Sequence, residues 1–196
     1  MVLSGPSGAM RLFLAVELPP ELREDVARFT APFQGLAPAV RWTQTENLHV
    51  TLRFLGSIEP ARLEAVKAAA RRAAGEIVPF DLELSGAGAF PDPARPQVLW
   101  LGFGRGREAL GHAASLVRGE LEAQRIETER RPFAAHLTVA RIREAGPDAR
   151  LAATAFLAAE LPPMRPFPAT HVTLFQSHLS DSGSRYEVLE RYAFRV

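Results

Sequence analysis

The strongest indication of the fold is the stretch Leu48-His49-Val50-Thr51-Leu52-Arg53-Phe54-Leu55. It is typical of a β-strand ended by Gly56, because it is rich in β-branched and apolar residues. Residues i and i+2 of a strand share a face, so His49 and Thr51 lie on one side and their apolar neighbours on the other. The same His-apolar-Thr-apolar pattern recurs in His136-Leu137-Thr138-Val139. Two copies in comparable strands indicate two similar lobes that face each other across a cleft.

The rest of the chain supplies further strands and helices around these two. Segments 80–84 and 98–101 are spaced like a hairpin, which favours an α+β fold with antiparallel sheets over a doubly wound parallel sheet. No change in composition divides the chain, so residues 10–196 are expected to form one bilobal domain, preceded by a flexible extension at 1–9. We expect strands at 11–18, 40–42, 48–55, 80–84, 98–101, 135–142, 170–179 and 186–194, helices at 21–30, 60–74, 108–124 and 148–159, and a Gly- and Pro-rich loop at 86–96.

Composition excludes several classes of protein. The 196 residues include no cysteine, which excludes disulfides, cysteine-ligated metal sites and a thiol nucleophile. The net charge of +1 does not favour a surface that coats nucleic acid, but it leaves room for a locally basic cleft. Lys67 is the only lysine, and it lies in a predicted helix, so a lysine P-loop and a Schiff-base lysine are nearly excluded. With no membrane-length apolar stretch and no secretory signal, we expect a soluble, cytoplasmic protein.

A pair of histidines across a cleft suits displacement at phosphorus. One neutral imidazole can take a proton from water while the other, as imidazolium, gives a proton to the leaving oxygen. Histidine serves both roles because its ordinary pKa lies near 6.5. The hydroxyls of Thr51 and Thr138 can donate to the non-bridging oxygens, where charge accumulates in the transition state. This chemistry requires neither a metal nor another cofactor.

The sequence resembles the two-histidine phosphoesterases, and within them the bacterial and archaeal RNA 2′,3′-cyclic phosphodiesterases, also called 2′-5′ RNA ligases. The resemblance covers nearly the whole chain from Met10, and both signature motifs occur in the correct order. It is carried by Arg11-Leu12-Phe13, Arg41-Trp42, the run from Asn47 to Gly56, Gly88-Ala89-Phe90-Pro91, Val98-Leu99-Trp100-Leu101-Gly102, the run from Pro132 to Arg141, and Ser177-His178-Leu179 through Tyr186-Glu187-Val188-Leu189.

The resemblance implies a bilobal α+β fold in which two antiparallel sheets with flanking helices are related by a pseudo-twofold axis around a central cleft. It also implies hydrolysis of RNA 2′,3′-cyclic phosphate ends, or of cyclic nucleotides, to 2′-phosphomonoesters. Separately, we expect the protein to be a monomer. On this pattern His49 is the proton donor to the 3′-oxygen and His136 is the base that activates water. A related reaction joins RNA ends through a 2′-5′ linkage without ATP.

Four further residues are candidates for substrate binding. Alternation along the strand places Arg53 on the face of Thr51, where it could contact phosphate. Arg141 matches an arginine three residues after the second motif of the family, but alternation places it opposite His136 unless a bulge or the end of the strand re-aims it. Phe13 and Phe90 could stack on a base, because single-stranded nucleotides bind to aromatic faces.

Other interpretations of the motifs fit the sequence less well. A noncatalytic RNA-end binding protein would not need the intact histidines and threonines of both motifs. A metal hydrolase using His49, His136 and His171 would lack a carboxylate cluster. The third copy of the pattern, His171-Val172-Thr173-Leu174, lies in the closing strands, where the family has no catalytic group, so we interpret it as a chance match. The glycines at 102–106 lack the final glycine of a dinucleotide fingerprint.

Overall fold

Two four-stranded antiparallel sheets form the framework of the protein. The computed structural model describes residues 8–129, 131–144, 146–180 and 183–195. In the first sheet the strand order is β10-β9-β1-β3, and in the second it is β2-β7-β6-β5. The first sheet contains β1 (Met10–Glu17), β3 (His49–Ile58), β9 (His171–Ser180) and β10 (Gly183–Ala193); the second contains β2 (Val40–Trp42), β5 (Leu84–Phe90), β6 (Val98–Phe103) and β7 (Leu137–Ile142); β4 (Phe80–Leu82) pairs with β8 (Phe167–Ala169).

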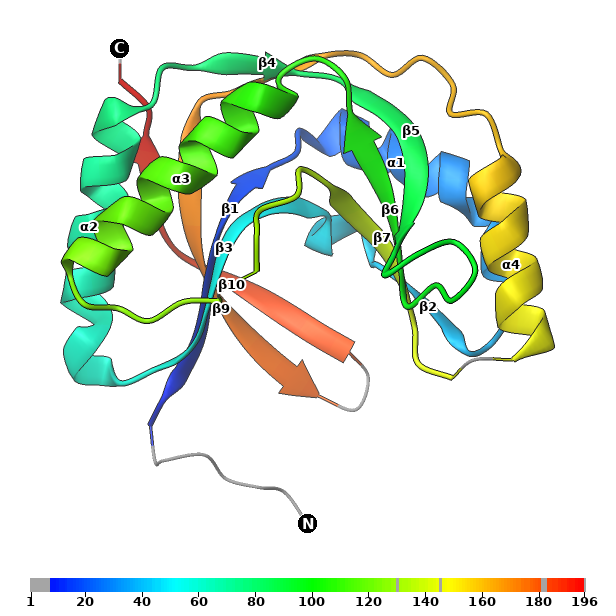
Figure 1. The fold of residues 1–196 in the computed structure, drawn as a ribbon, viewed down its shortest axis with the longest axis horizontal. Helices are drawn as coiled ribbons and strands as arrows, with labels where there is room; N and C mark the ends of the chain where they lie inside the picture. The colour runs from blue at the N-terminus through cyan, green and yellow to red at the C-terminus, as the bar shows by residue number, and fades with distance from the viewer. Residues whose placement is uncertain (1–7, 130, 145, 181–182, 196) are drawn as a thin grey trace.

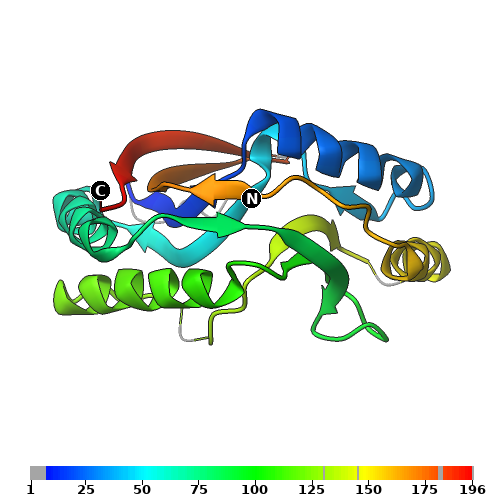
Figure 2. The ribbon, with the colours of Figure 1, turned by 90° about the horizontal axis from the view of Figure 1, so that it is seen from above.

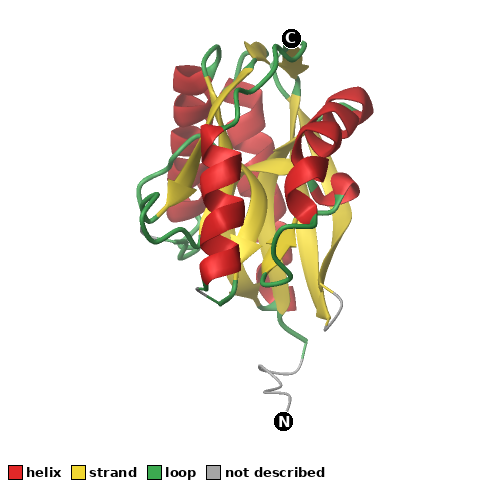
Figure 3. Ribbon diagram, turned by 90° about the vertical axis from the view of Figure 1, so that its right-hand side faces the viewer, coloured by secondary structure: helices red, strands yellow, loops and turns green. Residues whose placement is uncertain are grey.

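Four helices cover the two sheets in pairs. Helices α2 (Leu63–Glu76) and α3 (Arg107–Ala123) pack together on the first sheet, and α1 (Pro20–Gln34) and α4 (Pro147–Ala158) lie beside the second (Figure 1). Figure 2 shows the two pairs of helices at opposite ends of the molecule, and Figure 3 shows strands lying between the helices. This arrangement confirms the predicted bilobal α+β fold with flanking helices. The chain crosses repeatedly between the lobes, so neither sheet is made from one continuous half of the sequence.

The core explains why the helices form where they do. The buried residues of α2 are Val66, Ala69, Ala70, Ala73 and Ala74, which repeat at the 3–4 residue spacing of one helix face. Small side chains on this face allow α2 to approach α3. In β1, Leu12, Leu14 and Val16 belong to the main core, whereas Phe13 and Ala15 on the other face join a separate small cluster with Phe175.

The predicted loop at 86–96 is wrong in its first half, because β5 continues to Phe90. Its backbone pairs with β6, with Gly88 opposite Trp100. A Cβ on Gly88 would overlap the Trp100 ring, so glycine is required there by packing rather than by a turn. Of the predicted extension at 1–9, residues 1–7 lie outside the described residues, and β1 begins at Met10. No helix in the described part of the chain is long and apolar enough to cross a membrane.

Candidate active site

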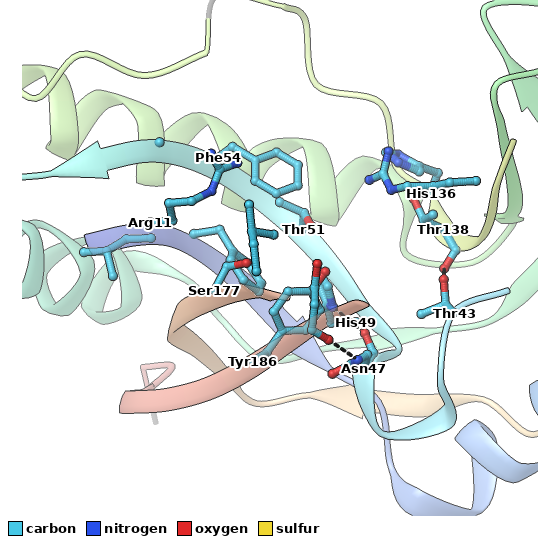
Figure 4. A pocket seen from close by; sticks show the side chains of 16 residues that line it. Arg11, Thr43, Asn47, His49, Thr51, Phe54, His136, Thr138, Ser177 and Tyr186 are labelled. Carbon is cyan, nitrogen blue, oxygen red and sulfur yellow. Dashed lines mark hydrogen bonds between the residues drawn. The ribbon is translucent and has the colours of Figure 1, made fainter. Parts of the chain in front are cut away.

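A pocket of about 440 Å³ lies between the two sheets and brings both motifs together. His49 and Thr51 enter it from β3, and Thr138 enters from β7 with His136 immediately before that strand (Figure 4). The polar lining is basic or neutral, and no Asp or Glu is among the described residues that line the pocket. Such a lining favours an anion. The full lining set is Arg11, Leu12, Phe13, Thr43, Asn47, His49, Thr51, Phe54, Gly56, His136, Thr138, Arg141, Ser177, Leu179, Ser184 and Tyr186.

The two histidines are anchored in the same way. Nδ1 of His49 lies 2.7 Å from the carbonyl oxygen of Asn47, and Nδ1 of His136 lies 2.7 Å from the carbonyl oxygen of Ala134. A carbonyl oxygen can only accept, so in each ring Nδ1 carries a hydrogen and donates it. The Nε2 atom of each neutral ring is therefore a free base. The shared i−2 contact is the local expression of the duplicated motif.

Neither threonine hydroxyl has a hydrogen-bond partner among the described residues, so both are available to a ligand. The backbone beside each hydroxyl is held in its sheet: Thr51 pairs with Ala15 of β1, and the Thr43 hydroxyl donates to the Thr138 carbonyl oxygen at 3.2 Å (Figure 4). Thr51 and Thr138 can thus donate to an anion from fixed positions on the two sheets.

A bulge in β7 aims Arg141 into the pocket. Trp100 pairs with Thr138, whereas Leu99 pairs with Ala140, so Val139 is an extra residue in β7. The extra residue reverses the alternation, and Arg141, opposite Val98, comes to lie on the face of Thr138. Of the two possibilities, a bulge or the strand end, the structure has the bulge, and Arg141 lines the pocket with both histidines. Its planar guanidinium is suited to bidentate contact with a phosphate.

A bulge in β3 has the opposite effect on Arg53, and the prediction that it shares the face of Thr51 is wrong. Thr51 pairs with Ala15 but Arg53 pairs with Leu14, so Leu52 is the extra residue. Arg53 is therefore turned away from Thr51; it is 7% exposed and donates to the carbonyl oxygen of Glu129 at 2.8 Å. It does not line the pocket that holds both histidines, but it lines an adjoining pocket on the side of His136. Phe54 takes its place and lines the pocket, 42% exposed.

The two predicted stacking residues lie in different environments. Phe13 is only 2% exposed, and its ring packs against those of His49, Phe175 and Tyr186 at 4.8–5.0 Å. Phe13 cannot offer a ring face to a base, so the prediction that it stacks on a base is wrong. Its ring instead packs against the imidazole of His49. Phe90 lies edge-on to His136 at 5.0 Å and lines an adjoining pocket of about 700 Å³. Trp42 packs against the core.

The surroundings of both histidines disfavour the imidazolium form in the empty site. Burial, opposed by the bond to Asn47 and reinforced by the charges of Arg141 and Arg23, lowers the pKa of His49 from its ordinary 6.5 to about 4. Burial and the charge of Arg141 also lower the pKa of His136. A bound phosphate anion would offset these positive charges and raise both pKa values. The site therefore gains a protonated histidine most readily when an anion is present.

The third His-x-Thr-x copy holds a carboxylate rather than facing the pocket. Thr173 donates to Oε1 of Glu17 at 2.5 Å, Nε2 of His171 lies 3.4 Å from the same oxygen, and Arg191 reaches both carboxylate oxygens at 2.7 and 3.1 Å. Hydrogen bonds from His171, Arg191 and Thr173 hold the pKa of Glu17 well below its usual range, against the effect of burial. Glu17 pairs with His49 across β1 and β3, so this cluster borders the active site.

The structure does not gather the three histidines of the metal-hydrolase alternative. In the described ranges, no group of three or more His, Asp or Glu side chains is placed to hold a metal ion. His171 is engaged with Glu17, while His49 and His136 share a pocket whose described lining has no carboxylate. Imidazole pairs without carboxylates or a third imidazole do not match usual metal sites.

Comparison with known proteins gives the family. A family model described as LigT like Phosphoesterase matches residues 16–100 and 105–186. This chain belongs to the LigT-like phosphoesterases. It is 31% identical over 190 residues to the RNA 2′,3′-cyclic phosphodiesterase of Escherichia coli, covering 95% of this chain and 98% of that protein. It is 32% identical over 129 residues to the enzyme of that name from Geobacillus stearothermophilus, spanning 66% of this chain but only 41% of that relative.

Solved structures show the same LigT-like fold. The crystal structure of TT0787 from Thermus thermophilus superposes with a TM-score of 0.77 at 29% identity, covering 95% of this chain and 98% of that one. E. coli LigT complexed with 3′-AMP superposes with a TM-score of 0.72 at 28% identity, covering 96% and 99%. The predicted membership in the RNA 2′,3′-cyclic phosphodiesterase family of enzymes is thereby confirmed.

Several residues of this LigT-like pocket were missed by sequence reasoning. Asn47 orients His49 through its carbonyl oxygen and ties β3 to β10, because its amide donates to the Ser184 carbonyl oxygen at 2.8 Å. Tyr186 lies edge-on to His49 at 5.1 Å. Both stood inside segments that carried the family resemblance, which was the available signal. Phe54 lies in such a segment too, but strand alternation from Thr51 places it on the core face, and only the bulge at Leu52 turns it to the pocket.

Proposed function

We propose that this chain hydrolyses the 2′,3′-cyclic phosphate end of RNA to a 2′-phosphomonoester by acid-base catalysis without a metal. The observation that carries the proposal is the pair of identically anchored imidazoles that share with Arg141 one pocket in whose described lining there is no carboxylate. The relatives' name and the complex of E. coli LigT with 3′-AMP support a nucleotide substrate. All of these groups come from one chain, so we expect the monomer to be active.

In the proposed reaction the cyclic phosphate lies between the histidines. His136, neutral, takes a proton from water as the water oxygen bonds to phosphorus. The bond from phosphorus to the 3′-oxygen breaks on the opposite side, and His49, protonated, gives its proton to that oxygen. Arg141 and the two threonine hydroxyls hold the non-bridging oxygens, on which charge builds. The products are a 2′-phosphomonoester and a free 3′-hydroxyl.

The second pocket supports this division of roles. It shares Thr51, Phe54, His136, Thr138 and Arg141 with the first pocket, but it does not reach His49. An in-line displacement brings the nucleophile and the leaving group to opposite sides of phosphorus. The nucleophile would then arrive through the second pocket, on the side of His136. A 5′-hydroxyl arriving by the same route would form a 2′-5′ linkage in place of hydrolysis.

The direct test uses an oligonucleotide with a 2′,3′-cyclic phosphate end, in EDTA and without ATP. We expect a 2′-phosphate product, identified by its resistance to an enzyme that removes only 3′-phosphates. A 3′-phosphate product, or activity lost in EDTA, would contradict the proposal. Binding of the oligonucleotide without turnover would instead favour the noncatalytic alternative.

A second substrate separates the two histidine roles. A nucleotide p-nitrophenyl phosphodiester has a leaving group that needs no proton, so it does not need a general acid. The loss caused by His49→Ala should be much smaller on this substrate than on the cyclic phosphate. His136→Ala should lose comparable activity on both. The reverse pattern would exchange the two assignments.

A further inference from the structure

The active-site pocket extends away from the histidines along the first sheet and reaches an arginine that the proposed reaction does not use. Phe13 and Arg11 follow each other on the pocket face of β1, and Ser177 and Leu179 do so on β9. Ala15 pairs with Thr51, and Arg11 lies four residues before Ala15, near the beginning of β1. At the usual rise per residue, its Cα lies about 13 Å along the strand from that level. Arg11 lines this pocket, and Figure 4 shows its side chain away from both histidines.

Arg11 is exposed and makes no ion pair with the described residues. None of the described residues that line this pocket is acidic. The hydroxyl-bearing residues Ser177, Ser184 and Tyr186 line the same pocket. A guanidinium with no ion-pair partner among the described residues, in a pocket whose described lining contains no carboxylate, is suited to a second anionic group on the same ligand.

The proposed chemistry determines which group that is. If His49 protonates the 3′-oxygen, the terminal ribose lies over the first sheet, beside His49. Phe54, 42% exposed, borders both pockets there and offers an aromatic face on which a base can stack. The RNA strand then continues from the 5′ side of that ribose, and the part of the pocket that runs along β1 and β9 leads to Arg11. The next anionic group along the strand is the phosphodiester 5′ to the terminal nucleoside.

We infer that Arg11 binds the phosphate 5′ to the terminal nucleoside and so makes the enzyme select strand ends over free cyclic nucleotides. This inference rests on the proposed function, because it takes the position of the cyclic phosphate from it. It adds the orientation of the RNA, with its 5′ part running toward the beginning of β1. Arg11 acts on binding of the strand and not on the proton transfers.

The test compares a dinucleotide with a cyclic phosphate end and the matching cyclic mononucleotide. The quantity measured is the ratio of their kcat/KM values, and Arg11→Gln should lower this ratio about tenfold, the effect of one lost charged hydrogen bond. Arg185→Gln is the matched control: it removes the same charge from the same sheet, between Ser184 and Tyr186, but it lies on the opposite face of β10 and does not line the pocket. It should leave the ratio as in the wild type.

Salt gives a second readout. One phosphate contact on a single strand contributes about 0.7 to the slope of log affinity against log salt. The wild-type slope of log kcat/KM should be steeper for the dinucleotide than for the mononucleotide by about this amount, and Arg11→Gln should remove the difference. A merely structural role of Arg11 would not change the two slopes relative to each other.

An unchanged ratio in Arg11→Gln, or an equal fall of the ratio in Arg185→Gln, would overturn the inference. Failure of the proposed function is distinct, because then the wild type would hydrolyse neither substrate. In that case calorimetric binding of the mononucleotide and dinucleotide 2′-phosphates to the wild type and Arg11→Gln gives the same comparison without turnover. Equal affinity ratios in the two proteins would again overturn it.

Discussion

Arg141→Gln is the substitution that tests the geometry of the site most sharply, because it should change two independent quantities. The side chain reaches the pocket only through the bulge at Val139. In the proposed complex it donates to the phosphate, and in the empty site its positive charge disfavours the imidazolium form of both histidines. Removing the charge should therefore slow the reaction and raise both histidine pKa values.

The size of the rate effect follows from the interaction removed. A hydrogen bond to a charged group contributes about 1.5–3 kcal/mol, so kcat/KM on a cyclic mononucleotide should fall about 10- to 150-fold. The pKa of His49 should rise above about 4, although burial, which is the largest cause of its lowering, remains. The pKa of His136 should also rise, since Arg141 is the charge that acts on it. Arg141→Lys should keep the pKa values near those of the wild type but lose the bidentate geometry.

The assay combines steady-state kinetics with NMR titration of the imidazole carbon-bound protons in the free enzyme. Arg143→Gln is the control, since it removes the same charge two residues further along the chain without lining the pocket. It should change neither quantity. If Arg141→Gln lost activity while both histidine pKa values stayed at their wild-type positions, the arginine would not face the histidines as the bulge requires, and the reasoning would be refuted.

Four further predictions concern the histidines and the Glu17 cluster. His49→Ala and His136→Ala should each lose at least about 100-fold in kcat on the cyclic phosphate while Tm, measured by calorimetry, stays close to that of the wild type; near-normal turnover would reject the pair. The pH profile of kcat/KM should be bell-shaped with its optimum below about 6.5, because the pKa values of both histidines are lowered in the free enzyme. The optimum of kcat should lie at higher pH, because bound phosphate raises both pKa values. An optimum of kcat at lower pH than that of kcat/KM would contradict this prediction. Glu17→Gln should lower the free energy of unfolding by about 2 kcal/mol at pH 7. This difference should shrink as pH falls below about 4, because the depressed pKa of Glu17 stabilises the native state only while its carboxylate remains ionised. His171→Ala should keep kcat within about threefold of the wild type, and a collapse like that of His136→Ala would mean that the wrong pair of histidines has been chosen.

Local sequence patterns predicted the elements and the chemistry of the motifs. Alternation alone placed His49 beside Thr51 and His136 beside Thr138, and the structure has these four side chains lining one pocket. This works because a strand repeats every two residues whatever it pairs with. The helix spacing of the small residues in α2 was equally local, and its boundary differs by only a few residues from the expected range 60–74.

Tertiary structure alone decided which residues beyond the motifs face the pocket. Whether a strand holds an extra residue depends on its partners, and β1 and β6 are distant in sequence from the bulges at Leu52 and Val139. One bulge turned Arg141 inward and the other replaced Arg53 by Phe54. Pattern could not separate the third His-x-Thr-x copy from the other two, because all three satisfy the same alternation. The difference is the neighbour that β1 supplies: Glu17 occupies His171 and Thr173, while the histidines of the other two copies bond to their own backbone and leave Nε2 free.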